Sequence, residues 1–166
     1  MSDTASKQTL LSSGRGSLTA SLIARTFDVP ESFILTANAG LEESFELAAR
    51  PLSQGQMSIV YKATRRSDGE RVSLKVLNLS ALVQQERAML KATAEVATLQ
   101  QLPPNEHIVR LSALACTPVE CALVVDRSDF DLLSLVEDRG GRLEEAEAAA
   151  ILKQVVKAIA HLHTHK

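Results

Sequence analysis

The chain has 166 residues, of which 18 are lysine or arginine and 20 are aspartate or glutamate, so its formal net charge is −2. This balance gives no reason to expect nucleic acid or an anionic membrane surface as a partner. No apolar run approaches the ~20 residues that a membrane-spanning helix needs. We therefore expect a cytoplasmic protein with one domain of ordinary size. Because only 3% of its residues are aromatic, its core must be aliphatic.

The first 44 residues divide into two parts. Residues 1–19 are rich in serine and threonine, a composition that predicts disorder. Residues 27–47 carry only scattered apolar side chains. We expect residues 1–44 to form a disordered or loosely ordered extension and residues 45–166 to form the folded domain.

Residues 52–75 predict two β-strands on either side of a glycine-containing turn. Apolar side chains alternate in the first strand, and Ser-Asp-Gly at 67–69 supplies the reversal before the second. Gly55 allows backbone to approach a ligand closely, because it has no Cβ atom. Lys75 then presents one positive charge near the end of the second strand, so this hairpin is suited to cover a phosphate group.

The next predicted elements are a helix and a second hairpin. Residues 84–102 combine strong helix formers with spaced apolar residues, and two prolines at 103–104 stop the helix. Two strand-like runs at 111–116 and 121–125 are joined by residues 117–120, which predicts a β-hairpin.

Residues 143–163 predict a long helix with one apolar stripe at i, i+3, i+4 and i+7. Glutamates lie at its start and histidines at its end, as the helix dipole favours. Burial of six aliphatic side chains of this stripe would contribute roughly 10 kcal/mol. Left exposed, the stripe predicts self-association, a partner protein or a sequence that continues beyond Lys166.

In this order, these segments resemble the protein kinases, from about Phe45 to the last residue. The first hairpin resembles the glycine-rich loop of that family, GxGxxGxV, with one of three glycines retained. The positions that correspond to this pattern are Ser53, Gly55, Ser58 and Val60. The strand that ends at Lys75 resembles the VAIK motif, with Ser73 in place of the alanine.

In the protein kinases, this lysine pairs with a glutamate of the following helix. The resemblance places that glutamate at Glu95, with Glu86 as a less favoured alternative. A lysine held by a carboxylate keeps its charge and its direction toward the α- and β-phosphates of ATP. Without that context, Glu95 would be a solvated side chain on a helix surface, worth a few tenths of a kcal/mol.

Residues 122–127 resemble the strand that enters the kinase hinge, whose backbone N–H and C=O groups hold the adenine edge. The resemblance implies Val125 as the gatekeeper and residues 126–128 as the hinge. It also implies that Asp131 takes the ribose hydroxyls, although aspartate is equally suited to cap the helix that follows. Ser73 adds a hydroxyl near the adenine, and that hydroxyl must find a hydrogen-bond partner.

The resemblance implies an α+β fold: a five-stranded antiparallel sheet with one packed helix, then the first helices of a truncated second lobe. It implies a serine/threonine protein kinase, similar to the calcium- and calmodulin-dependent kinases, which would use ATP, with Mg in the complete domain, and a protein substrate. The implied ATP-binding residues are Ser53, Gly55, Ser58, Val60, Lys75 and Glu95.

The catalytic HRD and DFG motifs of the family do not occur in these 166 residues. We therefore expect the chain to be inactive alone. The alternative function is a non-catalytic, pseudokinase-like module that binds a partner protein through the last helix.

Cysteines and histidines suggest two further sites. Cys116 and Cys121 flank the short second hairpin loop, but we expect reduced thiols because no secretory signal precedes them. His161 and His165 would share one helix face and could hold a metal weakly. No cysteine or carboxylate completes that set, so we expect a solvated helix end.

Overall fold

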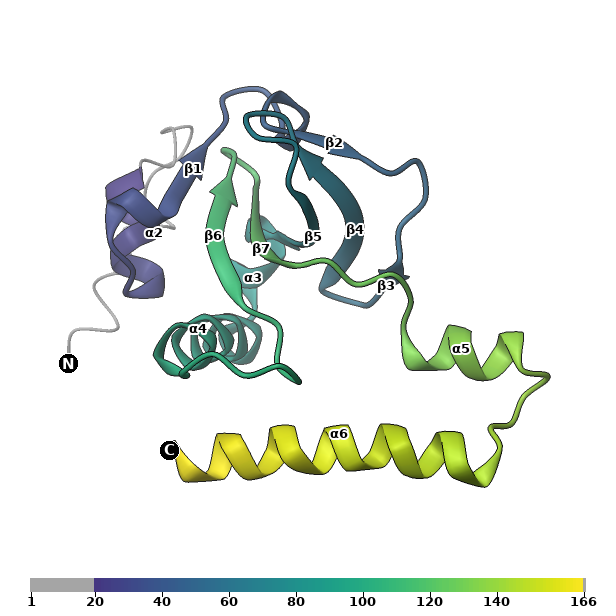
Figure 1. Cartoon of the computed structure of the whole chain (residues 1–166). Helices are drawn as coiled ribbons and strands as arrows, with labels where there is room; N and C mark the ends of the chain where they lie inside the picture. Colours follow the sequence, from purple (N-terminus) through teal and green to yellow (C-terminus); the bar gives the residue numbers. More distant parts are fainter. Residues whose placement is uncertain (1–19, 166) are drawn as a thin grey trace.

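The computed structural model describes residues 20–165, which form one curled β-sheet with helices beside it (Figure 1). The expected disorder of residues 1–19 lies outside the described residues. The strands are β1 (Ile34–Thr36), β2 (Phe45–Leu47), β3 (Ser53–Gln54), β4 (Ser58–Arg65), β5 (Arg71–Asn78), β6 (Leu111–Cys116) and β7 (Glu120–Asp126). The α-helices are α2 (Ala20–Phe27), α3 (Leu79–Gln84), α4 (Glu86–Gln101), α5 (Leu132–Asp138) and α6 (Glu145–Thr164). Two 3-10 turns are η1 (Glu31–Phe33) and η2 (Leu41–Glu43).

The strand order in the sheet is β1-β6-β7-β5-β4-β2, and β3 pairs with β4 beside β2. All neighbours are antiparallel except β1 and β6, which are parallel. The α+β class is therefore confirmed. Within residues 20–165 the sheet has seven strands instead of the expected five.

Residues 20–44 differ from the loosely ordered extension that we expected. Ile23, Ala24 and Phe27 share one face of α2 and are at most 7% exposed. Ile34 begins β1, which pairs with β6 and so covers the edge of the sheet. The apolar residues of 27–47 looked scattered in the sequence because they divide among two 3-10 turns and two three-residue strands. The division of the chain at residue 44 remains a prediction.

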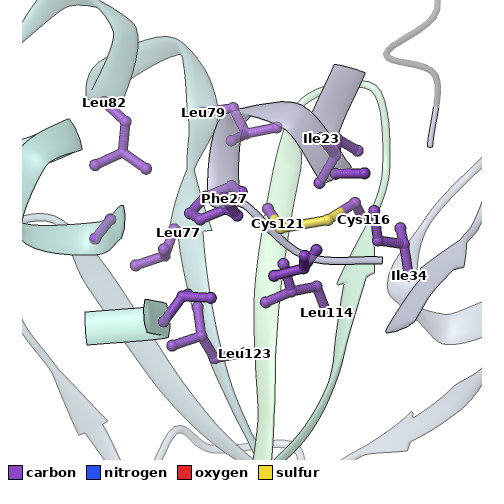
Figure 2. Close-up of a cluster of buried hydrophobic side chains, with 14 of the residues drawn as sticks. Ile23, Phe27, Ile34, Leu77, Leu79, Leu82, Leu114, Cys116, Cys121 and Leu123 are labelled. Atoms are coloured by element: carbon purple, nitrogen blue, oxygen red, sulfur yellow. A yellow bond between two sulfur atoms is a disulfide. The ribbon is translucent and has the colours of Figure 1, made fainter. Parts of the chain in front are cut away.

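The cysteines also differ from our expectation. Cys116 and Cys121 occupy facing positions on β6 and β7, with their Cα atoms 4.2 Å apart, and are joined by a disulfide. Figure 2 shows this bond among buried apolar side chains that include Ile23 and Phe27 of α2. The expectation of reduced thiols, which rested on the absence of a secretory signal, is not met.

The predicted helices are present. The expected helix at 84–102 corresponds to α4, which begins after Gln85 in extended backbone and ends before the two prolines. The short α3 before it was not expected. The long helix predicted at 143–163 corresponds to α6. Near its end, the Nε2 atom of His161 lies 3.0 Å from the Pro103 carbonyl oxygen. A membrane span needs a long helix of mainly apolar residues, and the helices of residues 20–165 include none of that kind.

Candidate functional site

Strand register brings most of the predicted site residues to one face of the sheet. Val60 of β4 faces Lys75 of β5, and Ser53 of β3 faces Val60. Facing residues of paired strands direct their side chains to the same side, and so do residues two apart along one strand. Ser58, two residues before Val60, and Ser73, two residues before Lys75, therefore lie on this face as well. Below, we call it the α4 face.

The α4 face is covered in part by helix α4. Met89, Ala92 and Val96 of this helix are buried in a cluster that also contains Leu77 and Leu123 of the sheet. These contacts set the position of the helix relative to the sheet, because buried side chains pack closely and do not slide. Glu95 precedes the buried Val96 in the helix and is itself half-buried, so it lies at the edge of this cluster.

Lys75 and Glu95 form the ion pair that the sequence suggested. The Lys75 Nζ atom lies 2.7 Å from both Oε1 and Oε2 of Glu95, so both carboxylate oxygens accept hydrogen bonds from the ammonium group. The two side chains are 31% and 38% exposed, which leaves the ammonium accessible to a ligand. The structure thus favours Glu95 over Glu86, the first residue of α4, as the partner of Lys75.

The hairpin between β3 and β4 contains Gly55, whose amide donates a hydrogen bond to the Ser58 carbonyl oxygen at 2.8 Å. A Cβ atom added at Gly55 would lie 3.5 Å from that oxygen, an ordinary contact distance. The fold itself therefore does not require glycine here. Ser53 and Gly55 are exposed, and Ser58 and Val60 are half-buried.

At the other end of the α4 face, strand β7 ends and the chain leaves the sheet. Asp126 is the last residue of β7; its amide donates to the Arg110 carbonyl oxygen at 3.2 Å. Val125, the expected gatekeeper, faces Ser73 across the ladder and is half-buried. The Ser128 amide donates a hydrogen bond to the Ser73 Oγ atom at 2.9 Å. The Ser73 hydroxyl thus has the partner that it needs, which the sequence did not identify.

Asp131 caps helix α5. Its Oδ1 atom accepts a hydrogen bond from the Ser134 amide at 2.7 Å, as expected for aspartate at this position. This backbone hydrogen bond and a second one from the Ser134 side chain hold the pKa of Asp131 below its usual value. The cap is observed, and the ribose-binding role of Asp131 remains a prediction.

Side chains of the kinds that bind metals do not gather in groups of three in the part of the chain that the structure describes. Residues 20–165 contain no group of three histidine, cysteine, aspartate or glutamate side chains arranged to hold a metal ion. His161 and His165 do lie close, with ring centroids 4.3 Å apart, but they contact backbone carbonyl oxygens.

Residues 48–166 match the family described as "Protein kinase domain". Cell division control protein 2 homolog 3 of Trypanosoma brucei brucei is 28% identical over 131 residues, a match that covers 78% of this chain and 41% of that protein. Death-associated protein kinase dapk-1 of Caenorhabditis elegans is 28% identical over 129 residues, covering 74% of this chain and 9% of that protein.

Among solved structures, the crystal structure of Rad53 1-466 in complex with AMP-PNP is similar with a TM-score of 0.63 at 25% sequence identity. That match covers 76% of this chain and 32% of the solved chain. The chain thus spans less than half of each of these relatives. A further similar protein is Serine/threonine-protein kinase 33 of Mus musculus, which is 29% identical over 125 residues, a match that covers 75% of this chain and 25% of that protein. The chain belongs to the protein kinase family.

Proposed function

We propose that this chain is the ATP-binding part of a serine/threonine protein kinase domain. The observation that carries the proposal is the ion pair of Lys75 and Glu95, with both carboxylate oxygens 2.7 Å from the ammonium nitrogen. The pair fixes the direction of one positive charge on a face that also carries the backbone hairpin around Gly55. A fixed, accessible cation beneath a backbone loop suits a polyphosphate, because it attracts the anion without a large loss of side-chain freedom on binding.

In this proposal, ATP supplies the phosphoryl group when bound, and the residues of the chain hold and orient it. Lys75 holds the α- and β-phosphates and Glu95 aims the ammonium group. The hairpin of Ser53, Gly55 and Ser58 covers the phosphates, Val60 covers the base, and the connection at residues 126–128 lies against the adenine edge. We assign no residue to magnesium, because the family's metal-binding residues belong to the catalytic loop and the DFG motif, which do not occur in these 166 residues.

The 166 residues contain neither an HRD nor a DFG motif. These motifs supply the base and the metal ligands in the kinase mechanism. We therefore propose that this polypeptide binds ATP without transferring its phosphoryl group to a protein serine or threonine.

The test is a titration of the purified chain with Mg-ATP, by calorimetry and by thermal unfolding, for the unmodified chain and for Lys75→Ala. Charge-assisted hydrogen bonds are worth about 1.5–3 kcal/mol, so Lys75→Ala should weaken ATP binding about 10- to 100-fold. Lys153→Ala, on the exposed side of α6, removes the same charge away from the site and should bind like the unmodified chain. Equal ATP affinity in the Lys75→Ala variant would refute the proposal.

A second candidate function is a non-catalytic module that binds a protein through α6. Four apolar side chains of this helix are 45–62% exposed: Leu152, Val155, Val156 and Ile159. Exposed apolar patches of this kind mark interaction surfaces. This candidate predicts that sedimentation detects a defined oligomer of the chain, that Val156→Asp abolishes it, and that ATP shifts the unfolding temperature of neither form.

A further inference from the structure

One side-chain hydrogen bond links two parts of the candidate site that lie 55 residues apart. The Ser128 amide donates to the Ser73 Oγ atom at 2.9 Å. Ser73 is only 1% exposed, and Ser128 is half-buried. The bond therefore forms at the inner end of the α4 face, where water has little access to the hydroxyl.

The Ser128 amide lies outside the sheet ladder. Strand β7 ends at Asp126, which faces Val72 in the last pair of the β5–β7 ladder. Beyond that pair, backbone donors need other acceptors, because a buried N–H group without a partner is costly. Ser73 supplies that acceptor for Ser128.

Ser73 also has a defined position relative to the phosphate end of the site. It precedes Lys75 by two residues on the same strand and lies on the same face, at a separation of roughly 7 Å. A nucleotide with its phosphates at Lys75 would thus place its base toward Ser73 and Ser128. This step rests on the proposed function.

Adenine and guanine differ at the ring nitrogen of their hydrogen-bonding edge. N1 of adenine is an acceptor, whereas N1 of guanine carries a proton and is a donor. A free backbone N–H at the base end of the site would favour adenine and disfavour guanine, because a donor facing a donor leaves both groups unsatisfied. An N–H that is already bonded to Ser73 cannot make this distinction.

We propose that Ser73 is a specificity-determining residue that withdraws the Ser128 amide from the nucleobase. The chain then holds nucleotides chiefly through their phosphates and discriminates weakly between ATP and GTP. Removal of the hydroxyl frees the amide and restores a preference for adenine.

The experiment measures the dissociation constants of ATP, GTP and adenosine by calorimetry for the unmodified chain and for Ser73→Ala. The unmodified chain should bind ATP and GTP within about threefold of each other. One added neutral hydrogen bond should tighten ATP and adenosine binding to Ser73→Ala by about three- to tenfold, with no gain for GTP. Ser112→Ala is the matched control: its hydroxyl also bonds to backbone, donating to the Val124 carbonyl oxygen at 3.1 Å, and its loss should leave all three constants unchanged.

The outcomes separate this inference from the proposed function. An unchanged ratio of ATP to GTP affinity in Ser73→Ala, together with weak ATP binding by Lys75→Ala, overturns the role of Ser73 and leaves the ATP site in place. A tenfold preference for ATP over GTP in the unmodified chain would also overturn the role of Ser73 and leave the ATP site in place. Absence of nucleotide binding in every variant, Ser73→Ala included, overturns both.

A measurement on the unmodified chain covers the case in which Ser73→Ala does not fold. The Ser128 amide should be protected from hydrogen exchange without nucleotide, and its NMR signal should keep its position when ATP is added. Rapid exchange, or a large shift with ATP that GTP does not cause, contradicts the proposal.

Discussion

Gly55 and Gly69 are glycines at opposite ends of strand β4 and meet different structural demands. A Cβ atom at Gly55 would make only ordinary contacts with Ser58. Gly69, in the turn to β5, has φ 75°, a left-handed conformation that L side chains rarely adopt. The sequence marks both positions as turn residues, and only the structure shows that the fold requires glycine at Gly69 and not at Gly55.

We expect Gly55→Ala to change the free energy of unfolding by no more than about 0.5 kcal/mol and to weaken ATP binding several-fold. The physical reason is that the added methyl group meets no protein atom closely but separates the hairpin backbone from the phosphates. Gly69→Ala should do the reverse, losing about 1 kcal/mol of stability through backbone strain with no change in ATP affinity. Urea unfolding and calorimetry distinguish the two. Unchanged ATP affinity in Gly55→Ala would mean that this hairpin does not cover the nucleotide.

Some contacts of the candidate site could be predicted from the sequence, and others could not. Lys75 and Glu95 were expected as a pair because family resemblance supplied both positions, and packing of α4 on the sheet brings them together. The need of the Ser73 hydroxyl for a partner was also expected. Its partner, Ser128, was not, because no local pattern relates a strand residue to a loop 55 positions away.

At the scale of elements, helix α5 depends on its first turn. The helix has seven residues, and none of these seven is buried, so packing contributes little to its stability. Asp131 satisfies the Ser134 amide, one of the donors that have no partner within the helix. The cap is therefore a main local determinant of where α5 begins.

The pKa of Asp131 is lowered in the folded chain. A group with a lowered pKa stabilises the fold fully above its unfolded pKa and loses that contribution as the pH falls through its folded pKa. We expect exchange protection of the Ser134 amide to be lost on acidification below the usual pKa range of aspartate. Asp131→Ala should lose this protection at every pH. Asp131→Asn should keep this protection at acid pH as well as at neutral pH, since asparagine also caps helices and does not titrate. Loss of protection in Asp131→Asn at neutral pH would contradict the cap.

At the scale of the whole molecule, residues before the predicted domain boundary contribute to the core. Phe27 of α2 is 2% exposed and lies in the same cluster as Leu114 and Leu123 of the sheet and Val96 of α4. Figure 2 shows it near the disulfide of Cys116 and Cys121. The structure therefore joins the extension to the sheet through side-chain packing and through the pairing of β1 with β6.

Phe27→Ala tests this contribution. Truncation of a buried phenylalanine costs about 3–5 kcal/mol, a large share of the roughly 5–15 kcal/mol by which whole domains are stable. Phe130→Ala is the control, because Phe130 is 59% exposed and its loss should change stability by no more than about 0.5 kcal/mol. Urea unfolding followed by circular dichroism measures both. Equal stability of the two variants would show that the extension does not contribute to the core.

The sequence by itself determined the helices α4 and α6, the two hairpins and the order of the kinase-like motifs. These features depend on side-chain periodicity and turn residues, which are properties of neighbouring positions. The tertiary structure decided the pairing of β1 with β6, the disulfide of Cys116 and Cys121, and the bond from Ser128 to Ser73. Each of these depends on strand register and on which apolar faces pack together, and neither is visible until distant segments are placed side by side.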